Sequence, residues 1–185
     1  KSVPLQLPIG TEDDFRGIVD LVTNKGVIWN DSTKGMTYEE IEIPAELKEE
    51  ADYWRGQLIE AVAEYDDTLM EKFFDDPNSI SELEIHEAVR KATIDMSIVP
   101  MLCGSAFKNK GVQTMLDLVM ELMPSPVDKQ SIKGTHPDTG EEISRKPDVS
   151  EPFTALAFKI ATDPYVGRLA YFRCYSGKLD SGSYV

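Results

Sequence analysis

The sequence has few cysteines and no long apolar run. Its 185 residues include two cysteines, Cys103 and Cys174, which lie far apart in the chain. Two isolated thiols form neither a disulfide framework nor a zinc site, and they suit a reducing compartment. No run of about 18 apolar residues occurs, and the first residues lack the layout of a signal peptide. We therefore expect a cytoplasmic protein without a membrane span.

Motifs that position phosphate groups or carry out catalysis are also missing. The one Gly-Lys pair, Gly177-Lys178, is followed by leucine and stands in no Gly-x-x-x-x-Gly-Lys-[Ser/Thr] loop. Neither of the two Asn-Lys pairs continues to the aspartate of Asn-Lys-x-Asp. The histidines, His86 and His136, have no second histidine and no serine or cysteine nucleophile nearby in the pattern. We predict no catalytic residue and no metal site in this chain.

Basic residues are scarce in one segment. The net charge of the chain is −14, and residues 39–95 contribute nearly all of it, with five basic and eighteen acidic side chains. Such a segment repels phosphate backbones and favours a basic protein partner, so no direct binding of nucleic acid is expected from it. The alternative interpretation is a solvated helical face that charge keeps soluble.

The first third of the chain predicts a small antiparallel sheet. Apolar residues occupy every second position of residues 3–9, around two prolines. This pattern predicts one strand, either short or at the edge of a sheet. Residues 17–22 and 26–29 are two more strand candidates, joined by a hairpin-type turn. Residues 37–43 alternate again and complete the sheet.

A helical region follows the sheet. Pro44 opens a long helix, where its missing N–H does no harm, and residues 68–74 continue as a short second helix. Ser81 and Glu84 have the spacing of a capping box. The apolar positions expected to face the core are Leu47, Ala51, Trp54, Leu58, Ala61 and Tyr65 of the long helix, and Ile85, Ala88, Val89 and Ala92 of the helix after the capping box.

Residues 98–123 predict a strand, a tight polar loop and a helix. The segment begins apolar, as a short buried strand would, and then meets Gly104 and two small residues. After Gly111 the apolar residues recur at spacings of three and four, which indicates a helix lying on a core. Pro124 ends this helix. In an open α/β sheet such a loop lies at the carboxyl end of the strand, where ligands bind. The helical stripe consists of Val112, Met115, Leu116, Val119, Leu122 and Met123.

This loop resembles the guanine-contacting loop, the fifth GTPase motif, of translational GTPases of the bacterial elongation factor G type. The resembling string is Cys103-Gly104-Ser105-Ala106-Phe107-Lys108-Asn109-Lys110-Gly111-Val112-Gln113. The segments Pro4–Gly10, Pro124–Pro126 and Ala157–Pro164 fit the same family, so the resemblance runs through essentially the whole chain. It implies that the chain is an excised middle piece of a longer protein.

The resemblance assigns a guanine site to this loop. It implies that Ser105, Ala106 and Phe107 line the base, with the Ala106 N–H donating to guanine O6. Adenine carries an amino group at that position, and an unpaired buried polar group costs roughly 1–3 kcal/mol, so guanine is preferred. The cofactor implied for the full-length parent is GTP or GDP with Mg²⁺. None is expected in this piece, which is predicted to be inactive alone.

The sheet and helices before the loop resemble the subdomain inserted late in the GTPase domain of that family. There the insertion faces the stalk protein of the large ribosomal subunit. Glu60, Glu64 and Asp67 follow one another at spacings of four and three, so we predict that they share one face of the long helix. These three carboxylates are the predicted contact for the stalk protein.

The last third is expected to be a different domain. Residues 128–150 are rich in turn signals and read as a linker, with a hairpin turn around residues 137–140. Residues 153–161 and 169–175 are predicted strands, and residues 183–185 begin another. They resemble the start of the β-barrel that follows the GTPase domain, cut short, so we predict edge pairing between copies or disorder near the C-terminus.

The resemblance therefore implies the end of an α/β P-loop GTPase domain with an α+β inserted subdomain, followed by the first strands of an all-β barrel. The boundaries are 1–127 for the GTPase part, with the insertion at about 1–97, then 128–150 for the linker and 151–185 for the barrel. The implied parent uses GTP to drive translocation of tRNA and mRNA on the ribosome. Alternatives are a stand-alone acidic binding module, or a related GTPase of the recycling, release or ribosome-protection type.

Overall fold

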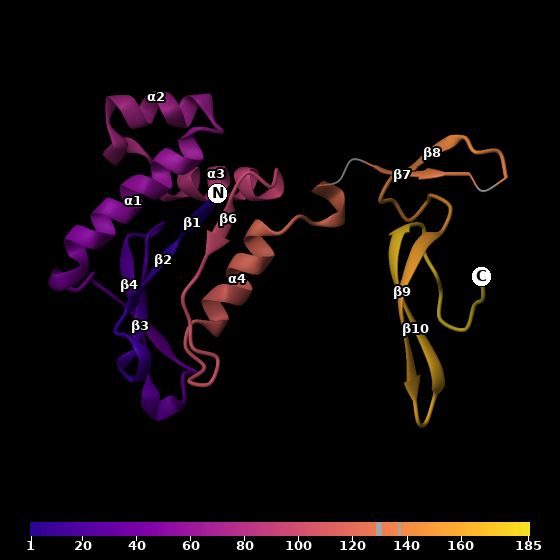
Figure 1. Cartoon of the computed structure of the whole chain (residues 1–185), viewed down its shortest axis with the longest axis horizontal. Helices are drawn as coiled ribbons and strands as arrows, with labels where there is room; N and C mark the ends of the chain where they lie inside the picture. The colour runs from indigo at the N-terminus through magenta and orange to yellow at the C-terminus, as the bar shows by residue number, and fades with distance from the viewer. Residues whose placement is uncertain (129–130, 137) are drawn as a thin grey trace. The chain divides into compact units, whose positions relative to one another are not determined.

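The chain folds into two compact units, residues 1–123 and 124–185. In the computed structural model, residues 1–128, 131–136 and 138–185 are described (Figure 1). Each unit is considered by itself. The boundary between the units falls directly after α4 (Val112–Leu122), the helix that Pro124 was expected to end.

A four-stranded antiparallel sheet forms one part of the first unit. Its order is β2 (Gln6–Ile9), β3 (Gly17–Asp20), β4 (Lys25–Trp29) and β5 (Tyr38–Ile41), each strand pairing with its neighbour in sequence. The short helices η1 (Glu12–Asp14) and η2 (Asp31–Thr33) lie in the connections β2–β3 and β4–β5. The predicted antiparallel sheet is confirmed.

Residues 3–9 form two strands, so the prediction of a single strand is wrong. β1 (Ser2–Pro4) pairs in parallel with β6 (Val99–Met101), whereas β2 joins the four-stranded sheet. Leu5 connects the two sheets, because its N–H donates to the Met101 carbonyl and its own carbonyl accepts from Leu21 N–H. Apolar residues alternate without interruption through residues 3–9, so no local pattern shows that the pairing strand changes at Leu5.

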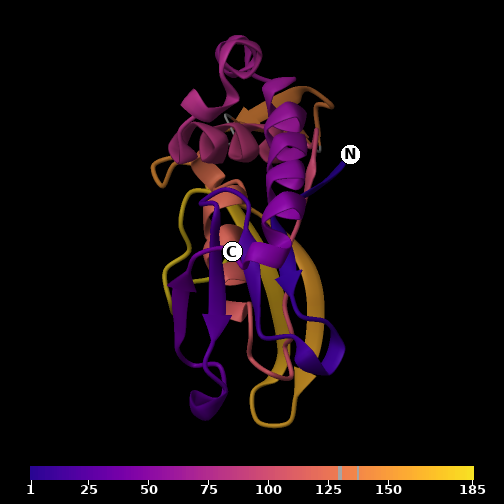
Figure 2. The ribbon, with the colours of Figure 1, turned by 90° about the vertical axis from the view of Figure 1, so that its left-hand side faces the viewer.

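Three α-helices and two short 3-10 helices follow the sheet: η3 (Ala45–Leu47) leads into α1 (Lys48–Ala63), and α2 (Asp67–Asp75) and η4 (Pro77–Ser79) precede α3 (Glu82–Ile94). The capping box of Ser81 and Glu84 is present at the start of α3, as predicted. Figures 1 and 2 show α2 and α3 at one end of the unit and η1, η2 and the loop after β6 at the opposite end. The main core consists mainly of buried residues of β1, β2, β3, α1 and α3, and a second, smaller cluster of Phe15, Ile18, Val27 and Trp29 packs against Cys103.

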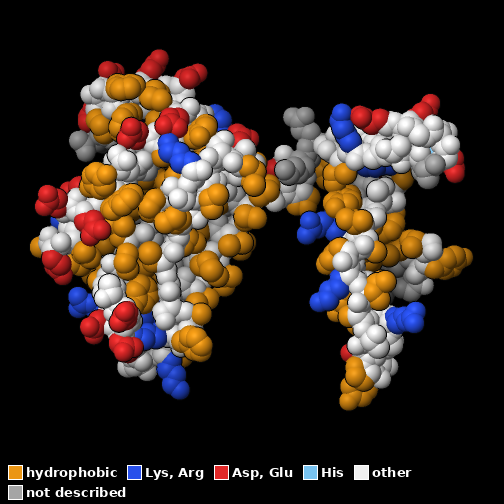
Figure 3. Space-filling view, in the orientation of Figure 1, with side chains coloured by type: hydrophobic (Ala, Val, Ile, Leu, Met, Phe, Trp, Pro, Cys, Tyr) orange, Lys and Arg blue, Asp and Glu red, His pale blue; other side chains and the backbone are white. Residues whose placement is uncertain are grey.

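β6 and α4 are much more exposed than the sequence predicted. Val99 and Met101 of β6 are exposed, and so are Met115, Leu116, Val119 and Met123 of the α4 stripe. Leu122 of the predicted stripe is buried, and Leu118, which the prediction left out, packs against the core beside it. Hydrophobic side chains accordingly gather on the surface over α4 (Figure 3). The prediction that this stripe faces the core is therefore wrong at Met115, Leu116, Val119 and Met123, which lie on the surface of this unit.

The second unit is built from two hairpins. β7 (Ile132–Thr135) pairs with β8 (Glu142–Arg145), after the short helix η5 (Pro126–Asp128). β9 (Thr154–Asp163) pairs with β10 (Gly167–Ser176), with register shifts after Tyr171 and after Cys174. The segment expected to be a linker thus contains a hairpin, in which Pro137 of the predicted turn lies outside the described residues. Residues 183–185 are not a strand, so that prediction is wrong.

Candidate functional site

The loop between β6 and α4, residues 102–111, is a closed turn that faces solvent. Ser105 and Lys110 form an isolated antiparallel bridge, with Ser105 N–H to Lys110 O at 2.8 Å and Lys110 N–H to Ser105 O at 3.0 Å. Asn109 N–H donates to Ala106 O at 3.1 Å, and Asn109 takes a positive φ of 52°. The order of strand, loop and helix is the one predicted.

The three predicted base-lining residues stand at the tip of this β6–α4 loop. Ala106 and Phe107 are exposed, and Ser105 is half-buried. The Ser105 N–H is used inside the loop, whereas the Ala106 N–H has no acceptor among the described residues. The amide expected to donate to guanine O6 is therefore free to donate. No neighbouring side chain seals the tip, since the ring of Phe107 is fully exposed.

Lys110 anchors the loop from beneath. Its side chain is only 3% exposed, and its Nζ lies 3.1 Å from Phe15 O and 2.6 Å from an Asp31 carboxylate oxygen. A buried ammonium is unfavourable unless it is hydrogen-bonded and paired. The position of Lys110 therefore depends on both the β2–β3 connection, which carries Phe15, and the β4–β5 connection, which carries Asp31.

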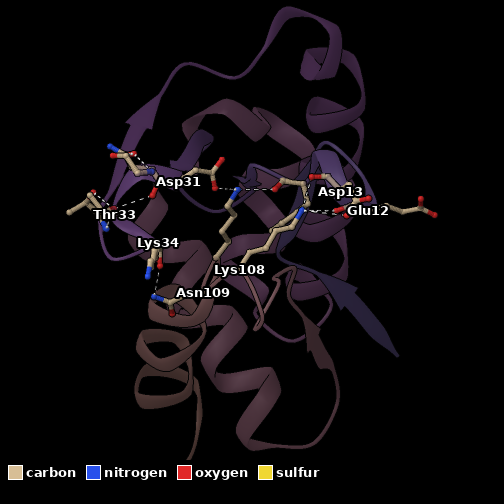
Figure 4. Close-up of polar contacts among 12 residues, drawn as sticks. Glu12, Asp13, Asp31, Thr33, Lys34, Lys108 and Asn109 are labelled. Carbon is tan, nitrogen blue, oxygen red and sulfur yellow. Dashed lines mark hydrogen bonds and ion pairs between the residues drawn. The ribbon is translucent and has the colours of Figure 1, made fainter.

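The neighbouring side chains of the loop reach the same two connections (Figure 4). Lys108 Nζ donates to Asp13 O at 2.6 Å, and Asn109 Nδ2 donates to Lys34 O at 3.3 Å. We name the connections, residues 10–16 and 30–37, the sheet loops. Most of these contacts use backbone carbonyls of the sheet loops, so they depend on the path of the main chain.

Two buried polar contacts fix the ends of the β6–α4 loop. At its start, the Gln6 side-chain carbonyl accepts from Cys103 N–H at 3.1 Å, and Gln6 is 3% exposed. Burial raises the pKa of the Cys103 thiol. At its end, Gln113 on the first turn of α4 accepts from Trp29 Nε1 at 3.1 Å and donates to Gly35 O at 2.9 Å.

Sequence reasoning did not identify Gln6, Asp31, Gly35, Lys110 or Gln113 as parts of this site. Gln6 is 97 positions from Cys103, and Asp31 and Gly35 belong to an ordinary polar turn. The only available signal was the composition of the loop itself, in which two lysines and an asparagine follow the small residues. Nothing in that composition indicates which lysine is buried.

The predicted acidic contact is arranged differently from the expectation. α1 ends at Ala63, Glu64 is its C-cap residue, and Asp67 begins α2. The prediction that Glu60, Glu64 and Asp67 share one helix is therefore wrong. The physical reason is Asp66, whose side chain accepts hydrogen bonds from Thr68 N–H and Leu69 N–H and starts a new helix. All three carboxylates are exposed, and Glu64 is paired with Lys1 at 2.9 Å.

Metal-binding clusters and membrane-spanning helices are both absent from the described residues. Within residues 1–128, 131–136 and 138–185, no three His, Cys, Asp or Glu side chains form a group able to hold a metal ion. In that part of the chain, no helix has both the length and the apolarity needed to cross a membrane.

Comparison with known proteins gives close relatives along the whole chain. An elongation factor G of Cytophaga hutchinsonii is 65% identical over 184 residues, 100% of this chain and 26% of its own length. An elongation factor G of Amoebophilus asiaticus is 61% identical over 183 residues, 99% of this chain and 26% of its own length. This chain thus spans about a quarter of these relatives. No family model matches it.

A solved structure shares the fold. A crystal structure of a Thermus thermophilus protein superposes with a TM-score of 0.73 and 26% sequence identity. The match covers 98% of this chain and 24% of that protein. The mixed α/β architecture and the terminal strands are therefore those of an existing larger protein.

Proposed function

We propose, from the homology of the whole chain to a quarter of elongation factor G, that it is a segment of a translational GTPase of that type. In the parent protein, GTP hydrolysis would drive movement of tRNA and mRNA on the ribosome. The observation that carries the proposal is the identity of 65% and 61% over essentially all residues. The domain division into a GTPase part, a connecting segment and the start of a barrel belongs to the same proposal.

The β6–α4 loop is proposed to form one wall of the guanine site. The free Ala106 N–H at an exposed tip supports this role, because a base can approach a small residue closely enough to receive that hydrogen bond. Ser105 would support the turn through its bridge to Lys110, and the exposed ring of Phe107 would flank the base.

The exposed apolar surface of β6 and α4 supports a GTPase domain that continues beyond these residues. Parallel strands are normally covered on both faces, yet β6 has a partner only in β1 among the described strands. Exposed apolar patches of this kind indicate a contact surface. The phosphate-binding and Mg²⁺-binding parts, which this sequence lacks, would belong to the covering segment, so the isolated chain is proposed to be inactive.

Binding of guanine nucleotide by the full-length protein tests the guanine site. The probes are GDP and an analogue that lacks the O6 atom. The wild type should bind GDP about ten to a hundred times more tightly than the analogue, the range expected for one unpaired buried polar group. The variant Ala106→Pro lacks the N–H and should lose most of this difference. Equal binding of both probes by the wild type would overturn the role of the loop.

A separate proposal concerns the acidic end of α1 and α2. The exposed Glu60, Glu64 and Asp67 are proposed to contact a basic region of the ribosomal stalk protein, in a cytoplasmic protein. Carboxylates also crowd the neighbouring surface in Figure 3, which supports attraction of a basic partner. Glu60→Lys should weaken binding to the stalk protein, whereas Glu142→Lys on β8 should not. An equal effect of both would attribute binding to net charge alone.

A further inference from the structure

We propose that the sheet loops position the β6–α4 loop, so that guanine-nucleotide affinity depends on residues that do not touch the nucleotide. The inference rests on the proposed function of the β6–α4 loop and names the residues that regulate its shape. Lys110 and Gly35 are the two positioning residues, because each fixes the main chain of the loop by a different kind of contact.

The first contact is the buried lysine. Lys110 Nζ is held by Phe15 O of one sheet loop and by the Asp31 carboxylate of the other, at 3.1 Å and 2.6 Å. The main chain of Lys110 is paired in both directions with Ser105. A shift of Lys110 must therefore move Ser105, and with it the adjoining Ala106 N–H. The side-chain contact below the loop is linked in this way to the amide at its tip.

The second contact is a close approach of two main chains. Gly35 has φ +72°, and a Cβ at this position would lie 2.3 Å from Asn109 O and 2.7 Å from Lys108 O. Both neighbours are backbone atoms, so they can give way only if the loop moves. Glycine is required here by its φ and by the space, and any larger residue would displace residues 108–109.

The remaining contacts act in the same direction. Lys108 Nζ donates to Asp13 O, Asn109 Nδ2 to Lys34 O, and Gln113 Nε2 to Gly35 O. Hydrogen bonds thus run from the second half of the turn and the start of α4 to both sheet loops. The sheet acts as a support for the loop, because the loop has only its own Ser105–Lys110 bridge and the Asn109–Ala106 turn to define its shape internally.

The test uses the full-length protein with GDP as the probe. The variants Gly35→Ala and Lys110→Met disturb the support at two independent places. Gly140→Ala is the matched control for the first, since Gly140 also has φ +72° but a Cβ there would meet nothing within 4 Å. Lys25→Met is the control for the second, since Lys25 forms an exposed ion pair with Glu40 at 2.7 Å on the same sheet.

Both test variants should weaken GDP binding about tenfold, as expected for the misplacement of one buried hydrogen bond. The KM for GTP should rise by a similar factor. The kcat at saturating GTP should stay within about twofold, because the groups that position the phosphates are not part of this loop. Both controls should bind GDP like the wild type. If Gly35→Ala does not fold, Lys110→Met and Lys108→Met decide the question.

Unchanged GDP affinity in the test variants would overturn the inference, and so would a parallel loss of kcat or an equal weakening in the controls. Failure of the wild-type protein to bind GDP is a different result. It would remove the proposed function itself, whereas a wild type that binds GDP alongside unaffected variants would remove only the positioning role of the sheet loops.

Discussion

The two units differ in how they use their apolar residues. Within the described residues, every buried hydrophobic side chain lies in the first unit, between Val3 and Leu122. In the second unit, β9 and β10 form a long ladder with two register shifts, yet Leu156, Phe158 and Ile160 are exposed. Backbone pairing between neighbouring strands is thus extensive in a unit that has almost no core. Hydrogen bonding alone organises a hairpin, and burial requires a second layer.

The first unit obtains that second layer from segments that are distant in sequence. Helices α1 and α3 cover β1, β2 and β3, and the core includes Leu5, Leu58 and Ile85. Its loop end is also joined by long-range contacts, such as Lys110 with Phe15 and Gln113 with Trp29. Ordered loop geometry in this unit is therefore a consequence of the packed core. The second unit has fewer such contacts: Gly177 N–H donates to Asp148 O at 2.9 Å, and Ser176 Oγ donates to Pro152 O at 2.7 Å. Its β9–β10 turn is capped locally by Asp163, which accepts from Tyr165 N–H and Val166 N–H.

Separating the units gives the largest expected effect. Residues 1–123 expressed alone should unfold cooperatively, with a midpoint within a few degrees of that of the whole chain. Residues 124–185 alone should show no cooperative transition, because hairpins without a packed layer are marginal in water. Circular dichroism during heating measures both. A sharp transition in 124–185 would show that the contrast between the units is overstated.

Matched isoleucines in the two units give the next largest effect. Ile85 of α3 is 0% exposed and Ile160 of β9 is 74% exposed. Ile85→Ala should lower the free energy of unfolding by about 2–5 kcal/mol, the range for a deleted core side chain. Ile160→Ala should change it by less than about 0.5 kcal/mol. Urea denaturation followed by far-ultraviolet circular dichroism compares them, and similar costs would contradict the assignment of the core to the first unit.

Acidification should weaken the first unit through Glu84. Its hydrogen bonds with Lys72 and with the Ser81 N–H and hydroxyl lower the pKa of Glu84 from 4.5 to about 2. A carboxylate whose folded pKa is lowered stabilises the fold above its unfolded pKa, and this contribution is lost as the pH falls from about 4.5 toward 2. Thermal midpoints of the wild type and Glu84→Gln should therefore converge across this range. Parallel midpoints from about pH 6 to about pH 2 would contradict the prediction.

The smallest effect is expected at the hairpin ion pair of the second unit. Lys133 and Glu142 lie 2.9 Å apart, with both side chains 70% exposed. Exposed pairs contribute between about 0 and 1 kcal/mol, so Lys133→Met should leave the thermal midpoint of the whole chain unchanged within error. A clear decrease in that midpoint would show that the second unit contributes more to the stability of the chain than its few buried side chains indicate.

Local chemistry made much of the fold predictable. The capping box at Ser81 and Glu84 and the hairpin signals between β3 and β4 act within a few residues. The strand–loop–helix unit around residue 104 was predictable for the same reason. Pro44 precedes the short helix η3, and α1 begins only at Lys48, so the predicted start of the long helix at Pro44 is too early. Predictions that depended on a covering partner were wrong, as for the buried face of α4 and the buried β6 strand. The shared helix of Glu60 and Asp67 was wrong because the capping preference of Asp66 ended the long helix.

By itself, the sequence determined the order of elements, the small residues at the tip of the β6–α4 loop and the concentration of acidic charge in residues 39–95. Those features depend on local geometry, periodicity and composition. Only the tertiary structure decided that Leu5 divides one apparent strand between two sheets, that Lys110 is the buried lysine, and that Gly35 touches the main chain of Asn109. Apart from the bond between Leu5 and Leu21, these contacts join residues more than 70 positions apart. Packing of the whole unit, which no local pattern encodes, brings them together.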